Sequence, residues 1–227
     1  MLCPTNNDII YLDLGRELYY SSMEDKKSTL NQIKKYRELK TLLLDFNNLT
    51  DIPCDIFSLL KLEKLSLANN SLTSIPEHIG YLTNLKELYL QSNLLTSIPD
   101  SICNLTNLRL LHLADNKITW LPKHLDKLIQ LEGISITTNR LTSIPKNIST
   151  NKIWLFVMSS YQINNLSPDC EYLTIYYLDR KLDNLPISLK ELRLYSPIYR
   201  SENMRLDNIK LPFGCCLYID DKVQSTS

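Results

Sequence analysis

The sequence predicts an α/β solenoid, a stack of short units whose strands lie side by side in one parallel sheet. Two observations predict this fold class. The first is an asparagine that recurs every 23 residues, and the second is the same frame of aliphatic residues around each of these asparagines. A fixed period of about 20 to 50 residues indicates stacked units, because no single unit can bury its own apolar side. The recurring asparagines are Asn47, Asn70, Asn93, Asn116 and Asn139.

Each unit has 23 positions, and the first of them predict a strand. Positions 1, 4 and 6 are aliphatic, and polar residues alternate with positions 4 and 6, which is typical of a short strand with one buried face. Asparagine stands at position 9, proline at position 15, and aliphatic residues at positions 11, 14, 18 and 21. Proline has a fixed φ and no N–H, so it suits the first position of a helical turn across the unit from the strand. Full units begin at Leu39, Leu62, Leu85, Leu108 and Leu131.

The recurring asparagine has a structural role in this prediction. The chain turns sharply after each strand, which leaves backbone N–H and C=O groups facing inward. An asparagine amide is both a donor and an acceptor, so it can satisfy such groups in its own turn and in the next unit. We therefore expect the five asparagines to form a ladder through the solenoid.

Residues 39–152 contain the regular repeats, and residues 153–197 contain degenerate, shorter ones. In the shorter repeats, aliphatic and aromatic residues fill the strand frame in three successive groups, and a tyrosine and an arginine replace the ladder asparagine. We assign to positions 1, 4 and 6 the groups Ile153, Phe156 and Met158, then Tyr172, Ile175 and Tyr177, then Leu189, Leu192 and Leu194.

The two ends of the chain are expected to be caps, because a solenoid must cover the open edges of its core. In residues 1–38 we expect a first strand, built on Ile9, Leu12 and Leu14, and then a polar helix. That helix is expected from Glu24 to Glu38, with Leu30 and Ile33 facing inward. In residues 198–227 we expect a C-terminal cap and tail, with a closing strand over residues 211–219.

With these residues in view, the chain resembles a leucine-rich repeat protein of the typical 23-residue intracellular kind. The family pattern, Leu-x-x-Leu-x-Leu-x-x-Asn-x-Leu-x-x-Ile-Pro-x-x-Ile-x-x-Leu, is met almost completely in residues 39–150. The resemblance implies a horseshoe with a parallel concave β-sheet and short helical or irregular convex segments. It also implies that the concave sheet binds another protein.

The composition bears on source and on partners. Asn, Ile, Lys and Tyr are abundant, while Ala occurs twice and Gly four times, which indicates an AT-rich coding genome such as that of a giant DNA virus or an AT-rich protist. The 25 basic and 25 acidic residues give a net charge of zero, with no block of like charge. Nucleic-acid binders carry a basic face or stripe, so we expect no nucleic-acid partner.

The sequence predicts no catalytic, cofactor-binding or metal-binding residues, and we expect the protein not to be an enzyme. It has no glycine-rich phosphate loop, nucleophile elbow or zinc-protease helix. The six cysteines show no metal-ligand spacing and are expected to be reduced thiols. No signal peptide is apparent, and the longest apolar run, residues 153–158, is too short to cross a bilayer. These features predict an intracellular, cytoplasmic protein without a membrane partner.

Function is expected on the outward row of the sheet. Strand alternation sends positions 3, 5 and 7 to the concave face, opposite to the buried positions 4 and 6. Aromatic and aliphatic side chains with charged neighbours suit a protein partner. The candidate partner-binding residues are Leu43, Phe46, Lys64, Glu87, Tyr89, Gln91, Leu110, His112 and Asp115.

Two function classes follow from these observations. The first is a monomeric, non-catalytic scaffold that binds a partner protein on its concave face, in signalling or in modulation of a host pathway. The alternative is a structural or self-assembling repeat protein that associates through an imperfectly capped end. Zero net charge and the absence of an evident pocket give little support to a site for nucleic acid or a small ligand.

Overall fold

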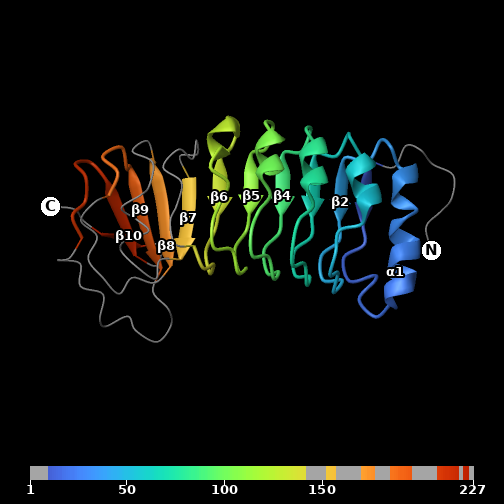
Figure 1. Cartoon of the computed structure of the whole chain (residues 1–227). Helices are drawn as coiled ribbons and strands as arrows, with labels where there is room; N and C mark the ends of the chain where they lie inside the picture. The colour runs from blue at the N-terminus through green and yellow to red at the C-terminus, as the bar shows by residue number, and fades with distance from the viewer. Residues whose placement is uncertain are drawn as a thin grey trace.

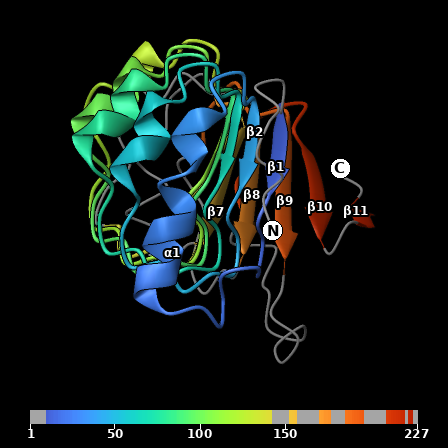
Figure 2. The same cartoon turned by 90° about the vertical axis from the view of Figure 1, so that its right-hand side faces the viewer.

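The computed structural model describes residues 10–141, 152–156, 170–176, 185–195, 209–219 and 222–224. In these residues one sheet runs the whole length of the molecule, and its strands follow one another in chain order (Figure 1). Neighbouring strands from β1 to β10 are parallel, and β11 is antiparallel to β10. Figure 2 shows the sheet on one side of the body and the helix and helical turns on the other. The α/β solenoid with a parallel concave sheet is confirmed.

The strands of the regular repeats are three residues long, and those that follow are mostly longer. The strands are β1 Tyr11–Asp13, β2 Thr41–Leu43, β3 Lys64–Ser66, β4 Glu87–Tyr89, β5 Leu110–His112, β6 Gly133–Ser135, β7 Lys152–Phe156, β8 Tyr172–Tyr176, β9 Glu191–Tyr195, β10 Cys216–Ile219 and β11 Lys222–Gln224. The helical segments are α1 Met23–Leu30 and the 3-10 helices η1 Ile33–Lys35, η2 Cys54–Ser58, η3 Glu77–Tyr81, η4 Asp100–Asn104 and η5 Leu125–Lys127.

The core lies between the sheet and the convex segments. Leu65 and Leu67, at positions 4 and 6 of one unit, are fully buried, as are Leu88 and Leu90 in the next. The convex segments close the core from the other side with residues such as Ile79. Each strand residue at position 4 pairs in register with the residue 23 positions later, so every leucine packs between its counterparts in the adjacent units.

Three of the convex turns begin one residue later than predicted. Pro53, Pro76 and Pro99 stand at the N-cap, directly before the 3-10 helices η2, η3 and η4, and not at the first helical position. The N-cap residue has an extended ψ, near 150° at Pro76, which the fixed φ of proline allows. The tighter 3-10 geometry fits the few residues available between the proline and the next strand.

The turn after each strand contains a left-handed backbone conformation that was not predicted from the sequence. Position 8 has a positive φ, between 51° and 58°, in all five regular units. The five residues are Phe46, Asn69, Ser92, Asp115 and Thr138. Left-handed backbone favours Gly and Asn, so a phenylalanine or a threonine there is held by its surroundings. The N–H of Phe46 donates to the carbonyl of Ala68 in the next unit, 3.1 Å away, and three of the other four residues make the equivalent bond.

The N-terminal cap is close to the prediction. Leu12 and Leu14 are buried around β1, and Leu30 and Ile33 face inward as expected. The predicted single helix is wrong in its length, because α1 ends at Leu30 and a separate 3-10 turn, η1, follows. The buried Lys26 of α1 donates from Nζ to the carbonyl of Asn47, 2.8 Å away, so the cap satisfies a backbone group of the first unit.

The frame predicted for the shorter repeats is wrong for two of the three groups. The strand register aligns Ile134 with Ile153, Ile153 with Leu173, and Leu173 with Leu192. Position 4 is therefore Ile153 and Leu173, where the prediction placed Phe156 and Ile175. The aligned residues follow one another after 19, 20 and 19 residues, so this part of the chain has a regular shorter period.

The frame given by the strand register agrees with the burial of the core better than the predicted frame does. Cys170, Leu173 and Ile175 are buried, whereas Tyr172 is only half-buried. The third group, Leu189, Leu192 and Leu194, was predicted in the correct frame and is buried. Met158 and Tyr177 lie outside the described residues.

The predicted closing strand is found, but it starts later than expected. The turn at Pro212 and Gly214, whose φ is +78°, precedes β10, and Leu217 aligns with Leu192. A further short strand, β11, then folds back on β10 and forms the last described edge of the sheet.

Candidate protein-binding site on the concave face

The asparagine side chains hold the turns that set the strands in register. The Nδ2 group of Asn93 donates to the carbonyls of Leu67 (2.9 Å) and Leu90 (3.1 Å), and its Oδ1 accepts from the N–H of Leu72 (3.0 Å). Asn70, Asn116 and Asn139 repeat this pattern. We expected each asparagine to bond backbone groups of the next unit, but it bonds those of the preceding unit. The backbone groups that lack a partner in one turn face the following unit, so the asparagine of that following unit reaches back to them.

Four of the candidate residues form one connected cluster on strands β3 to β5, which we call the concave cluster: Lys64, Glu87, Tyr89 and His112. The Lys64 Nζ lies 2.8 Å from Oε2 of Glu87, and the Tyr89 hydroxyl donates to the same carboxylate oxygen over 3.0 Å. The Tyr89 and His112 rings are stacked, with centroids 4.8 Å apart and an interplanar angle of 12°. The Lys64 ammonium also lies 4.8 Å from the centroid of the Tyr89 ring.

The contacts inside the concave cluster fix its protonation. Hydrogen bonding to Glu87 raises the pKa of Lys64, and the Lys64 ammonium lowers the pKa of Glu87, so both stay charged at neutral pH. Burial raises the pKa of the Tyr89 hydroxyl and lowers the pKa of His112. At neutral pH the cluster is thus an ion pair beside two neutral stacked rings.

The other candidate residues lie around the cluster without joining it. Leu43 and Leu110 are half-buried on β2 and β5, and Gln91 lies two residues beyond the end of β4. Phe46 and Asp115 are in the left-handed turns beyond the strands, so they belong to the rim of the sheet. The structure therefore divides the nine residues into strand positions on the concave face and turn positions at its edge.

Further contacts of this face were not predicted from the sequence. The Arg16 guanidinium lies 4.7 Å from the centroid of the Phe46 ring, which joins the N-terminal cap to the rim. At the other end of the sheet, Arg193 pairs with Glu191 at 2.5 Å and lies 4.7 Å from the centroid of the Tyr218 ring. The strand register aligns Leu192 with Leu217, which brings Arg193 beside Tyr218.

We expect the titration of His112 to make the folded state less stable in acid. Burial holds its folded pKa below the ordinary value of 6.5, whereas the unfolded chain recovers that value. As the pH falls through 6.5, the unfolded state takes up this proton first, so the free energy of unfolding decreases until the folded pKa is passed. Urea denaturation at about pH 7.5 and about pH 5.5 should show a larger loss of stability for the wild type than for His112→Gln.

Because His78 and His124 are present in both proteins, their contributions cancel in this comparison. Equal losses in the two proteins would contradict the assignment of the effect to His112.

The described residues bear on metal binding and on thiol chemistry in two ways. No group of three or more His, Cys, Asp or Glu side chains among them could hold a metal ion. Burial raises the pKa of the Cys215 thiol to about 11 and that of Cys170 to about 12, so neither is a thiolate at neutral pH. No helix in the described part of the chain is long and apolar enough to cross a membrane.

Comparison with known proteins identifies the repeats. The family model described as Leucine rich repeat matches residues 37–95, 61–118 and 83–141, which together cover the first four regular units and the start of the fifth. Residues 37–141 are leucine-rich repeats. Proteins with this fold are typically non-enzymatic and commonly bind other proteins. No curated protein matches this sequence.

Solved leucine-rich repeat proteins are similar in structure. One from Leptospira interrogans has a TM-score of 0.62 and 28% identity, over 84% of this chain and 51% of that chain. Internalin C2 from Listeria monocytogenes has a TM-score of 0.50 and 26% identity, over 55% of each chain. The plant peptide hormone receptor RGFR1, in complex with RGF2, has a TM-score of 0.55 and 28% identity, over 73% of this chain and 30% of that chain.

The chain thus spans about half the length of the Leptospira protein and less of the plant receptor. The three similar structures come from two bacteria and a plant, so they give no support to the predicted viral or protist source.

Proposed function

We propose that this leucine-rich repeat chain is a non-catalytic, monomeric module that binds a partner protein through the concave cluster. The observation that carries the proposal is the stacked pair of Tyr89 and His112, held on one side by the Lys64–Glu87 ion pair. Binding energy in protein interfaces concentrates in a few aromatic and charged side chains near the centre of the contact. Here such side chains lie together in the middle of the concave sheet.

Preorganisation adds to this argument. A flexible tyrosine loses side-chain entropy when a partner immobilises it, which weakens binding. The Tyr89 hydroxyl already bonds Glu87, and its ring already stacks on His112, so little rotamer freedom is left to lose. Half-buried Leu43 and Leu110 supply apolar area beside the rings, and Gln91 and Asp115 supply polar groups toward the rim. This arrangement of an apolar centre and a polar edge is typical of protein interfaces.

The similar structures support the class of partner. The plant peptide hormone receptor was solved in complex with RGF2. By analogy with that complex, we expect only that the partner of this chain is a protein or a peptide. We expect the interaction to serve signalling or a host pathway inside the cell.

Affinity capture with matched variants tests the proposal. Tyr89→Glu/His112→Glu places two carboxylates in the concave cluster beside Glu87, and we expect it to lose at least about tenfold of its affinity for the captured protein. The control is Tyr81→Glu/His124→Glu, which makes the same two exchanges at exposed residues of the convex side. Proteins retained from lysate would be quantified by mass spectrometry, and the leading one would be purified for titration calorimetry.

A partner that binds the concave variant as tightly as the wild type would contradict the proposed surface, provided that both variants melt cooperatively near the wild-type temperature. A partner lost from the convex control alone would also contradict it. Sedimentation of the wild-type chain alone separates this proposal from self-assembly, since the proposal requires a monomer.

A further inference from the structure

A row of charged side chains runs along the solenoid just before the strands, at position 2 of each unit. Its members are Lys40, Glu63, Lys86, Arg109 and Glu132. Glu63 bridges two lysines, at 3.2 Å from Lys40 and 2.6 Å from Lys86. Both lysines lower the pKa of the Glu63 carboxyl. Arg109 pairs with Glu132, with 2.6 Å between Nε and Oε1.

The alternation of charge in this row is interrupted once. Lys86 and Arg109 lie next to each other on neighbouring units, and the N–H of Arg109 donates to the carbonyl of Lys86 over 2.8 Å. Each cation has its acidic partner on the side away from the other, Glu63 for Lys86 and Glu132 for Arg109. Like charges on adjacent strands repel, so this junction is the point in the row where an added carboxylate would be stabilised most.

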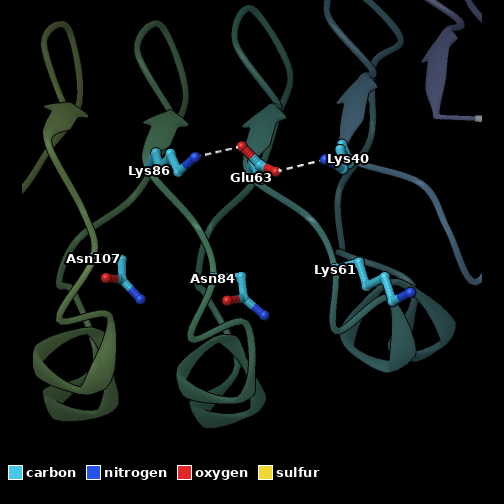
Figure 3. Close-up of a pocket in the computed structure, with 6 residues that line it drawn as sticks. All are labelled: Lys40, Lys61, Glu63, Asn84, Lys86 and Asn107. Carbon is cyan, nitrogen blue, oxygen red and sulfur yellow. Dashed lines mark hydrogen bonds and ion pairs between the residues drawn. The ribbon is translucent and has the colours of Figure 1, made fainter.

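A cleft of about 320 Å³ reaches the Lys86 side of this junction, and it is lined by Lys40, Lys61, Glu63, Asn84, Lys86 and Asn107 (Figure 3). The two asparagines that line the cleft below the charged row are held by hydrogen bonds to the backbone. The Asn84 amide donates to the carbonyl of Leu60 over 2.8 Å, and the Asn107 amide donates to the carbonyl of Thr83 over 2.9 Å. The charged side chains above them remain accessible, since about half of the Lys86 and Arg109 side chains is exposed.

We infer that this cleft is a second interaction site, separate from the concave cluster, which binds an extended acidic peptide segment with one carboxylate between Lys86 and Arg109. Glu132 takes the Nε–Nη2 edge of the Arg109 guanidinium, which leaves the Nη1–Nη2 edge to donate two parallel hydrogen bonds to an added carboxylate. Because the net charge of the chain is zero, the attraction arises from this local arrangement and not from an overall positive charge.

The geometry of the repeats favours a peptide over a single small anion. Adjacent strands are about 4.8 Å apart, so Lys40 and Lys86, two units apart, are separated by about 10 Å along the solenoid. Residues i and i+3 of a peptide in the extended polyproline II conformation are about 9 Å apart and lie on one face, because this helix has three residues per turn. A second acidic side chain three residues away can therefore reach the Lys40 end of the cleft while the first lies at Lys86 and Arg109.

Titration of the full chain with hexaglutamate, followed by ¹H–¹⁵N NMR at about 20 mM ionic strength, tests this inference. We expect the amide signals of Asn84, Lys86, Asn107 and Arg109 to shift, and hexaglutamine to leave them unchanged. Lys86→Gln/Arg109→Gln should weaken peptide binding at least about tenfold, since it removes both cations of the junction.

The matched control is Lys117→Gln/Arg140→Gln, which removes one lysine and one arginine from neighbouring units at position 10, after the strands. We expect it to bind the peptide as the wild type does, and Tyr89→Glu/His112→Glu should also keep this binding. Equal weakening by the control pair would overturn the inference, as would inorganic phosphate that binds as tightly as the peptide, because it would show a simple anion site.

Discussion

Asn93→Ala is expected to lower the free energy of unfolding by about 3 kcal/mol. The substitution removes a buried amide that bonds the carbonyls of Leu67 and Leu90 and the N–H of Leu72. Alanine leaves the buried Leu72 N–H without its partner, which costs about 1–3 kcal/mol, and the carbonyls of Leu67 and Leu90 each lose one donor while keeping the amides of Asn70 and Asn116. Because two of the three groups belong to the preceding unit, the loss also weakens the contact between units on which a solenoid depends.

Urea denaturation followed by circular dichroism measures this effect, with two matched variants. Asn84→Ala removes an exposed asparagine with a single bond to the carbonyl of Leu60, and it should cost less than about 1 kcal/mol. Asn93→Asp keeps the acceptor for the Leu72 N–H, removes the donors and places a carboxylate against the carbonyls of Leu67 and Leu90. A loss at Asn93→Ala no larger than that at Asn84→Ala would contradict the role assigned to the asparagine ladder.

Leu173→Ala is expected to destabilise the protein by about 2–5 kcal/mol, the usual range for a large-to-small change in a packed core. Leu173 is 1% exposed and aligns with Ile153 and Leu192 in the strands on either side. Tyr172, its neighbour on β8, is half-buried on the other face of the sheet, and Tyr172→Ala should cost less than about half as much.

This pair of variants decides between the two frames for the shorter repeats. The frame predicted from the sequence places Tyr172 inside, whereas the strand register places Leu173 inside. Thermal denaturation of both variants under identical conditions is sufficient. A lower melting temperature for Tyr172→Ala than for Leu173→Ala would restore the sequence-based frame.

The regular repeats could be predicted from the sequence because their signals agree with one another. Leucine spacing, the asparagine at position 9 and the proline at position 15 all specify the same 23-residue unit in residues 39–150. The shorter repeats lack the asparagine, and tyrosine and phenylalanine are tolerated on either face of a strand. Without an asparagine to mark position 9, a shift of the repeat frame by two or three residues could not be detected until the strand pairing was known.

The candidate site was predictable as a surface but not as a set of contacts. Strand alternation placed Lys64, Glu87, Tyr89 and His112 on one face, since this follows from the period of two. Which of them touch depends on the lateral register and on rotamers, which a repeat pattern does not specify. The left-handed turn that moves Phe46 and Asp115 to the rim was also hidden, because position 8 differs from unit to unit and is never a glycine.

The ion pairs of the charged row are further contacts that the repeat pattern does not specify. Lys86 and Arg109 are 23 residues apart in the sequence, and the repeat alone makes them neighbours. Only the ion pairs show that both carboxylates lie on the outer sides of this pair. Charge sums over the whole chain, which are zero, conceal such local imbalances.

A site-specific photo-cross-linker at residue 110 tests most directly whether the concave cluster contacts a partner. Leu110 lies on β5 beside Glu87 in register, and its half-exposed side chain can be replaced by benzoylphenylalanine. The control carries the cross-linker at residue 81, where Tyr81 is exposed on the convex side. The proposal predicts one protein cross-linked from residue 110 and absent from residue 81, and lost when Tyr89→Glu/His112→Glu is added. The same protein cross-linked equally from both positions, or cross-linking unaffected by the double substitution, would contradict it.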